Sequence, residues 1–330
     1  MTTLLAQIAP QRSTQYADLA TALAPHELML SPMGRIIKSI DVLELGGQTY
    51  CRCELADEPD QPQLHELGML ATTSAFFWYH ETLGDFTGPF LNPIESGFDP
   101  YFPPDLVTTR RYKGKTNELF THFLCNLAKF SSDFADTPWD TLRVFDPLSG
   151  GGTTLFTALM LGADVAGVEK STKDVQSTAS FIKQYAKVQK IVCKVKEERL
   201  KKLGKRWWFS LGDAPKQCVL TAGDTAKSAQ LIAGFKKPHL IVADLPYGIQ
   251  HRGHLVELLT EALPVWTSLL TSGGAMALAW ESTRFARDEM ISLVESTGLL
   301  TVLNELPYNQ MVHRVDRVIK QRDILVARPL

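Results

Sequence analysis

The chain has 330 residues, of which 45% are hydrophobic and 21% charged, the composition of an ordinary globular enzyme with one large domain or two smaller ones. No apolar run approaches the roughly 18 residues that a membrane span needs, and the first residues lack the pattern of a secretory signal. We therefore expect a cytoplasmic protein that does not bind a membrane. The formal net charge is −2, so a nucleic-acid partner would need a local basic surface.

The first zone, residues 1–105, is predicted to be an accessory region of mixed α+β structure and a candidate for substrate binding. It is expected to begin with one or two helices. The segment 39–55 alternates like a hairpin around the pair Gly46-Gly47, which fits a primed turn. The run 87–105 is rich in proline, glycine and aromatic residues and indicates an ordered loop.

The five cysteines are too few and too scattered for a disulfide framework. Cys51 and Cys53 lie two apart in a strand-like segment, so we expect both on one face. No second pair at zinc-site spacing exists in the sequence, and we predict reduced structural thiols and no metal.

From residue 106 to 330, short apolar strands alternate with helical patterns, which indicates a doubly wound α/β domain. We predict a seven-stranded, mostly parallel sheet that ends in an antiparallel hairpin at one edge. The predicted strands are Leu142–Asp146, Asp164–Glu169, Val219–Ala222, Leu240–Asp244, Ala275–Trp280, Leu299–Leu306 and Asp323–Ala327.

A basic insertion at about 188–217 interrupts this pattern. Ten Lys and Arg residues lie between Lys183 and Arg206, against two glutamates. Lys183, Lys187, Lys190 and Lys194 have helical spacing and would form one stripe on a continued helix. Such a run is often only a solvated helix face; the alternative is a surface for phosphates, with Trp207 or Trp208 offering a ring for stacking.

The segment 144–154, VFDPLSGGGTT, ends an apolar strand at Asp146 and places three glycines before an apolar helix. Without side chains there, backbone N–H groups can approach a ligand closely at a helix N-terminus. The spacing is neither that of a dinucleotide-binding motif nor that of a phosphate-binding loop. The alternative is a tight strand-to-helix turn without a ligand.

Two acids follow the next predicted strands. Glu169 comes 23 residues after Asp146, about one β-α-β unit later, where an acid can accept hydrogen bonds from ribose hydroxyls. Asp224 follows the third strand, where it can accept from an adenine amino group. Alone, either carboxylate would be an ordinary solvated strand end.

The fourth strand ends in Asp244-Leu245-Pro246-Tyr247. Pro246 favours an extended Leu245, so the Asp244 carboxylate and the Leu245 carbonyl can accept hydrogen bonds from one amino group. Tyr247 offers a face on which a nucleobase can stack. Any single tetrapeptide of this kind can be a plain turn, but this one lies where such sheets bind ligands.

DPLSGGGTT and DLPYG resemble the glycine-rich motif and the Asp-Pro-Pro-Tyr-type loop of class I amino-methyltransferases of nucleic acids, which use S-adenosylmethionine (SAM). The resemblance covers about residues 110–330 and includes the preceding segment 111–120 (RYKGKTNELF), which resembles the motif at the methionine end of SAM. By itself, KGKTNE within this segment is a polar helix start with Thr116 as a cap. This motif order resembles that of the tRNA guanine-N2 methyltransferases with THUMP domains and of one class of adenine-N6 DNA methyltransferases. Leu245 replaces the first proline of the usual loop, a variant closer to the guanine-N2 RNA enzymes.

The resemblance implies that SAM is the cofactor and a nucleic acid the substrate, RNA in preference to DNA. It implies catalytic roles for Asp244, Leu245, Pro246 and Tyr247. It implies cofactor contacts for Lys115, Thr116, Asn117, Asp146, Pro147, Ser149, Gly150, Gly151, Gly152, Thr153, Thr154, Glu169, Asp224 and Thr225.

Four other functions remain open. They are a DNA adenine-N6 or cytosine-N4 methyltransferase, a SAM-binding subunit without activity, a methyltransferase of a protein or small-molecule amino group, and a Rossmann oxidoreductase. Nothing in the sequence indicates a protein partner.

Overall fold

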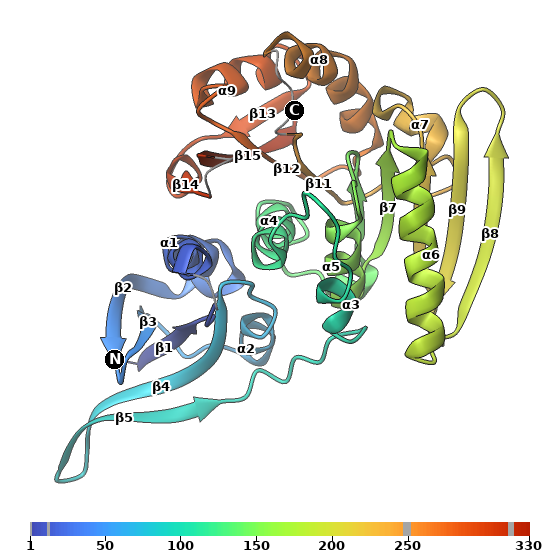
Figure 1. The fold of residues 1–330 in the computed structure, drawn as a ribbon. Coiled ribbons are helices and arrows are strands. Elements are labelled where there is room, and N and C mark those ends of the chain that lie inside the picture. Colours follow the sequence, from blue (N-terminus) through green and yellow to red (C-terminus); the bar gives the residue numbers. More distant parts are fainter. Residues whose placement is uncertain (1, 12–13, 247–251, 316–319) are drawn as a thin grey trace.

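The structure is a computed structural model that describes residues 2–11, 14–246, 252–315 and 320–330. It contains two separate sheets, one of five strands within residues 2–94 and one of ten strands within residues 143–329 (Figure 1). Among the described residues, no helix is long and apolar enough to cross a membrane.

The smaller sheet is antiparallel, with the strand order β2-β3-β1-β4-β5. Its strands and the helices of this region are β1 (Thr2–Ile8), α1 (Thr14–Leu30), η1 (Pro32–Arg35), β2 (Ile37–Leu45), β3 (Gln48–Leu55), α2 (Gln61–Leu67), β4 (Thr73–Leu83) and β5 (Phe86–Ile94). The hairpin around Gly46 and Gly47 is confirmed, because both residues have the positive φ of a primed turn (58° and 73°). Cys51 and Cys53 are both fully buried, as their spacing predicts.

Two predictions for this region are wrong. The chain begins with the central strand β1 instead of a helix, because Leu4, Leu5 and Ala6 are buried together, and a short apolar run does not distinguish a buried strand from a helix. The run 87–105 is a loop only in its second half, since its first half lies in β5, which pairs with β4.

The larger sheet has the order β13-β15-β12-β11-β6-β7-β10-β9-β8, with the short β14 beside β15. Its strands are β6 (Arg143–Asp146), β7 (Asp164–Glu169), β8 (Cys193–Leu200), β9 (Gly204–Leu211), β10 (Lys216–Ala222), β11 (Leu240–Asp244), β12 (Ala275–Glu281), β13 (Leu300–Leu303), β14 (His313–Arg314) and β15 (Gln321–Pro329). All seven predicted strands are present.

The strand pairing agrees with the predicted arrangement. β10, β7, β6, β11 and β12 are parallel, and the last two predicted strands, β13 and β15, form the predicted antiparallel pair at one edge, with β15 between β12 and β13. The sheet has ten strands because β8, β9 and β14 extend the predicted seven.

Helices cover both faces of the larger sheet, so the doubly wound arrangement is confirmed (Figure 1). Successive residues of β6 illustrate the two cores: Val144 packs with α4, α5 and α6, and Phe145 packs with α8 and α9 on the other face. The helices are α3 (Asp105–Thr108), α4 (Glu118–Phe130), η2 (Trp139–Thr141), α5 (Thr153–Leu161), α6 (Thr172–Val188), η3 (Thr225–Lys227), α7 (Ser228–Leu231), α8 (Arg252–Leu269), α9 (Arg287–Glu295) and η4 (Tyr308–Gln310).

The basic insertion is the hairpin β8–β9, which continues the sheet beyond β10. The predicted helical stripe is wrong, because α6 ends at Val188 and Lys190 has a φ of 56°, outside helical geometry. Trp207 is 3% exposed and donates its indole N–H to Glu197, so this ring is unavailable for stacking on a base. It faces inward because β9 alternates with a period of two.

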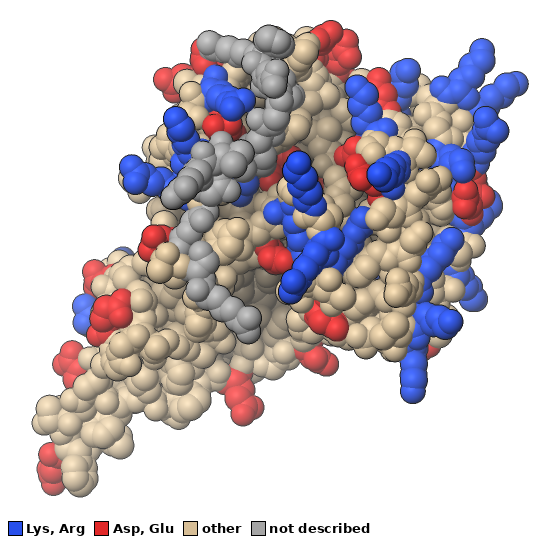
Figure 2. Space-filling view, viewed as in Figure 1, with Lys and Arg blue, Asp and Glu red and all other residues tan. Residues whose placement is uncertain are grey.

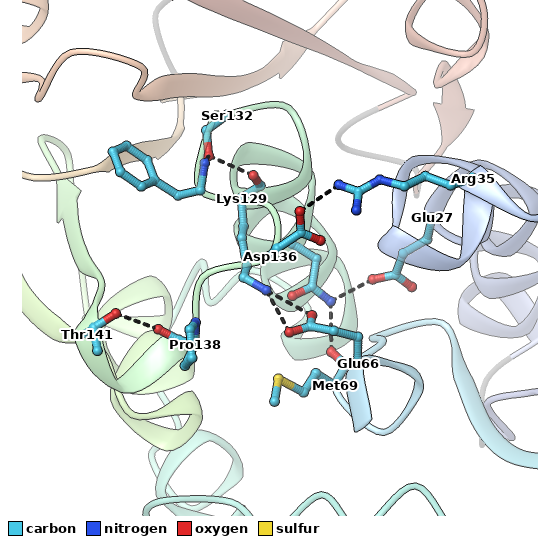
Figure 3. A network of polar contacts seen from close by, with 11 residues as sticks. Glu27, Arg35, Glu66, Met69, Lys129, Ser132, Asp136, Pro138 and Thr141 are labelled. Atoms are coloured by element: carbon cyan, nitrogen blue, oxygen red, sulfur yellow. Dashed lines mark hydrogen bonds and ion pairs between the residues drawn. The ribbon is translucent and has the colours of Figure 1, made fainter. Parts of the chain in front are cut away.

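Helix α4 joins the two sheets through buried polar contacts (Figure 3). Lys129 Nζ, with a fully buried side chain, lies 2.8 Å from Glu66 on α2. Asn126 Nδ2 donates to Glu27 Oε1 on α1 and to the carbonyl of Met69, each at 2.8 Å. Burial raises the pKa of Glu27. Moving the accessory region away from α4 would leave the buried Lys129 charge without its partner, which is energetically costly. These contacts therefore hold the accessory region in a fixed orientation.

Candidate active site

Three carboxylates gather where the parallel strands β6, β7 and β11 end. Asp146, Glu169 and Asp244 are the last residues of these strands, and carboxyl ends of parallel strands meet at one edge of the sheet. Burial raises the pKa of Asp146 to about 7, and the negative charges of Asp244 and Glu169 act in the same direction. The predicted acids are therefore close enough to interact.

The glycine turn brings two of the predicted cofactor residues together. Gly150 N donates to Glu169 Oε2 at 3.1 Å, and Glu169 Oε1 accepts from Ser171 N at 2.7 Å. Gly150 has a φ of 48°, and a Cβ added there would meet nothing within 4 Å, so the backbone faces open space. Since a carboxylate has about four acceptor sites, Glu169 retains capacity for a ligand's hydroxyls.

The segment before α4 crosses the glycine turn through Arg110 and Tyr112, neither of which was among the predicted site residues, although Tyr112 lies in the segment 111–120. A Cβ on Gly151 would lie 2.2 Å from Cζ of Tyr112, whose hydroxyl is 2.5 Å from Thr153 Oγ1. Arg110 Nη1 donates to the Gly151 carbonyl at 2.6 Å and to Thr178 Oγ1 at 2.5 Å. The adjacent aromatic and basic residues ahead of Lys115 were a signal for this packing.

Two residues predicted to contact the cofactor make contacts that hold this segment in place. Lys115 Nζ donates to the carbonyls of Val107 (2.7 Å) and Arg110 (2.9 Å) and pairs with Glu118. Asn117 is the N-cap of α4 and accepts from Phe120 N at 3.0 Å, so the prediction that Thr116 caps this helix is wrong.

Thr116 binds the acid of the predicted catalytic loop. Its hydroxyl donates to Asp244 Oδ2 at 2.6 Å, and Arg322 Nη2 lies 3.6 Å from the same oxygen. The other oxygen, Oδ1, is buried and has no hydrogen-bond partner among the described residues. Burial raises the pKa of Asp244, whereas the Arg322 charge and the Thr116 hydrogen bond oppose that rise.

Arg322 is a third residue that the sequence analysis missed. It comes from β15, its side chain is 4% exposed, and its guanidinium lies over the ring of Phe120 at 4.3 Å from the centroid. This packing aims a buried positive charge at one oxygen of Asp244 and leaves Oδ1 for another donor.

The rest of the predicted catalytic loop is only partly described. The Leu245 side chain is buried, and its N–H donates to the Ala279 carbonyl at 2.8 Å, whereas Pro246 is exposed. Tyr247 lies outside the described residues.

The two residues predicted to lie near the adenine, Asp224 and Thr225, differ in exposure. Asp224 is exposed, and its Oδ1 accepts from Ala226 N at 3.1 Å. Thr225 is buried and its hydroxyl accepts from the Trp266 indole at 3.0 Å, so it has a structural role.

The remaining predicted residues are buried in the glycine turn and the start of α5. They are Pro147, Ser149, Gly152, Thr153 and Thr154. Among the described residues, no cluster of three or more His, Cys, Asp or Glu residues has the arrangement of a metal site.

Fold and site together define an α/β domain in which three acids lie at the carboxyl ends of the parallel strands, beside a glycine turn. No family model and no curated protein matches the chain. Several solved structures are similar to it. TrmN from Thermus thermophilus is 13% identical over 100% of both chains, with a TM-score of 0.47. An rRNA methylase from Streptococcus thermophilus is 13% identical over 66% of this chain and 99% of its own, with a TM-score of 0.36.

A precorrin-6y C5,15-methyltransferase from Geobacter metallireducens is 13% identical over 66% of this chain and 91% of its own, with a TM-score of 0.38. All these values are too low to assign an activity to this chain.

Proposed function

We propose that the protein is a SAM-dependent methyltransferase that transfers a methyl group to an exocyclic amino group of a nucleobase, in RNA at guanine N2 or adenine N6. One observation carries this proposal. Asp244 Oδ1 is a buried acceptor without a partner among the described residues, at the sheet edge where a ligand would lie beside the glycine turn. A buried acceptor of this kind normally has a donor, which a substrate amino group would supply.

The charges at this edge fit SAM better than a dinucleotide. SAM supplies a methyl group on a positively charged sulfur, and the carboxylates of Asp146, Glu169 and Asp244 provide a complementary field. A dinucleotide carries two phosphates, which these acids would repel. Glu169 would accept from the ribose hydroxyls, Gly150 would let the ligand approach the backbone, and Asp224 would accept from the adenine amino group.

The acceptor side would act by holding the amino group. Asp244 Oδ1 and the Leu245 carbonyl would each accept an N–H, which turns the nitrogen lone pair away from the base ring and toward the methyl group. SAM, when bound, would supply the methyl group: the N–C bond would form as the C–S bond breaks, the electron pair of that bond would stay on the sulfur of S-adenosylhomocysteine, and the nitrogen would lose its proton to solvent. Thr116 and Arg322 oppose the rise that burial causes in the pKa of Asp244 and orient its carboxylate, and Tyr247 would supply the stacking surface.

Methyl transfer from radiolabelled SAM to total RNA and to genomic DNA, both taken from cells that lack the gene, tests this function. We expect label in RNA, traced by nucleoside analysis to N2-methylguanosine or N6-methyladenosine. Label in DNA alone would make the protein an adenine-N6 or cytosine-N4 DNA enzyme. SAM binding without transfer to either would indicate a different acceptor or a subunit without activity.

Asp244→Ala removes the acceptor oxygens and should abolish transfer, while the SAM affinity measured by calorimetry stays within about threefold of wild type, because Asp244 lies on the acceptor side. Asp99→Ala, a change at an exposed residue outside the site, is the matched control. A collapse of SAM affinity in the Asp244 variant would contradict its role toward the acceptor.

A further inference from the structure

Exposed positive charges follow the carboxyl edge of the larger sheet outward from the site. Lys170 comes directly after β7, Lys227 lies in η3 after β10, and Arg199, Lys201 and Lys202 lie at the tip of the β8–β9 hairpin; all five are exposed. Figure 2 shows Lys and Arg side chains over the region where Figure 1 places this hairpin.

The strand register places the hairpin tip at the same edge as the site. Glu169 pairs with Ala222, Ala222 with Lys205, and Lys205 with Arg199, in one row across four strands. The tip, residues 201–203, extends beyond that row. It therefore lies on the side of the sheet to which the strand-end carboxylates belong.

The acids of the hairpin already have partners. Glu198 is 2.6 Å from both Lys196 and Arg206, whose hydrogen bonds lower its pKa to about 2. Glu197 is 3.4 Å from Lys205. Within the described part of the chain, no ion pair involves the three cations at the tip, Arg199, Lys201 and Lys202. Their charge is therefore directed to the solvent.

The distance from the site to this tip sets the minimum length of a ligand that contacts both. Five strand spacings separate β11 from β8, and at about 4.8 Å each they span roughly 24 Å. A mononucleotide is far shorter. A ligand that reaches both must therefore be a polynucleotide of several nucleotides.

We propose that Lys170, Lys227 and the β8–β9 tip form a phosphate track that binds the backbone of a folded RNA while one of its bases occupies the site. This inference rests on the proposed function and specifies its substrate as a structured RNA long enough to span roughly 24 Å, the distance estimated from the strand spacing. The opposite end of the molecule is unsuited to this role, because residues 73–95, which form the β4–β5 hairpin, contain no Lys or Arg.

The test compares two charge-matched triple variants. The tip variant carries Arg199→Gln, Lys201→Gln and Lys202→Gln. The control carries Lys187→Gln, Lys190→Gln and Lys194→Gln, which remove the same charge at the other end of α6 and β8. Binding of a fluorescent RNA hairpin and of a DNA duplex of equal length is measured by anisotropy over a range of salt concentrations.

The tip variant should bind the RNA at least about tenfold more weakly at low salt, with a slope of log K against log salt lower by about two to three. The control should stay within about twofold of wild type. Equal losses in both variants would overturn the track, because only net charge would then matter. Equally tight binding of DNA would overturn the choice of RNA.

Activity distinguishes failure of the track from failure of the proposed function. If the track is correct, the tip variant loses kcat/KM on the hairpin RNA but not on a trinucleotide containing the target base. If wild type methylates no RNA yet binds it through the tip, the track stands and the proposed reaction fails.

Discussion

Replacing Arg322 by methionine should shift the pH dependence of methyl transfer. Asp244 accepts the substrate's N–H only when it is ionised, and burial already raises its pKa, with the Arg322 charge opposing that rise. Without the Arg322 charge, the pKa of Asp244 rises further. As the pH is lowered, the variant should therefore lose activity at a higher pH than the wild type does. Methionine keeps an apolar stem against Phe120, which limits the disturbance of packing.

The expected size follows from the distance between the charges. At the 3.6 Å that separates Arg322 Nη2 from Asp244 Oδ2, Coulomb's law with an effective dielectric constant of about 20 gives about 4–5 kcal/mol. Part of this is offset by solvent and relaxation, and a single opposite charge at such a distance typically moves a carboxyl group by about 1–3 pH units. The acid limb of the kcat profile should move up by that amount.

The assay is kcat against pH for wild type, Arg322→Met and Arg322→Lys, with thermal melting to confirm folding. The lysine variant retains a positive charge and should lie closer to wild type. A uniform loss of kcat at all pH values in the methionine variant, with an unmoved acid limb, would refute the electrostatic role and leave a purely structural one.

Three further predictions concern stability. Glu66→Gln leaves the buried Lys129 charge without its partner and should lower the free energy of unfolding in urea by about 3–5 kcal/mol; a loss below about 1 kcal/mol would contradict this. Asp146→Asn should raise the free energy of unfolding by up to about 4 kcal/mol at pH 8, because burial destabilises the charged carboxylate and raises its pKa to about 7. This gain should vanish at a pH below 3.8, the ordinary pKa of an aspartate, where the carboxyl group is protonated in both the folded and the unfolded protein. A gain independent of pH would show another cause. Gly151→Ala should cost about 1–3 kcal/mol through the clash with Tyr112, and adding Tyr112→Ala should recover part of that loss.

The sequence predicted the central sheet well because its strands are apolar runs that end in acids or turns. β7 and β11 have the predicted bounds, and their last residues, Glu169 and Asp244, lie at the predicted edge. The glycine turn was also recognisable, because an apolar strand, three glycines and an apolar helix follow one another directly.

Residue type alone did not reveal what each polar side chain binds. Lys115 and Thr225 have the chemistry of ligand contacts, yet both bind protein groups. Arg322 was missed because it is distant in sequence from Asp244 and reaches it only through the pairing of β15 with β12. The insertion was misjudged because its lysines match a helical period by coincidence, whereas the alternating burial in β9 shows a strand.

Helix α4 sets a fixed length between the two parts of the molecule. Thr116, just before its first turn, binds Asp244, while Asn126 and Lys129 near its other end bind the accessory region. A helix of 13 residues is about 20 Å long. If the accessory region and the larger domain bound the same substrate, α4 would fix the distance between the two binding surfaces. The modified position would then depend on its distance from the part of the substrate that the accessory region binds, as well as on the base.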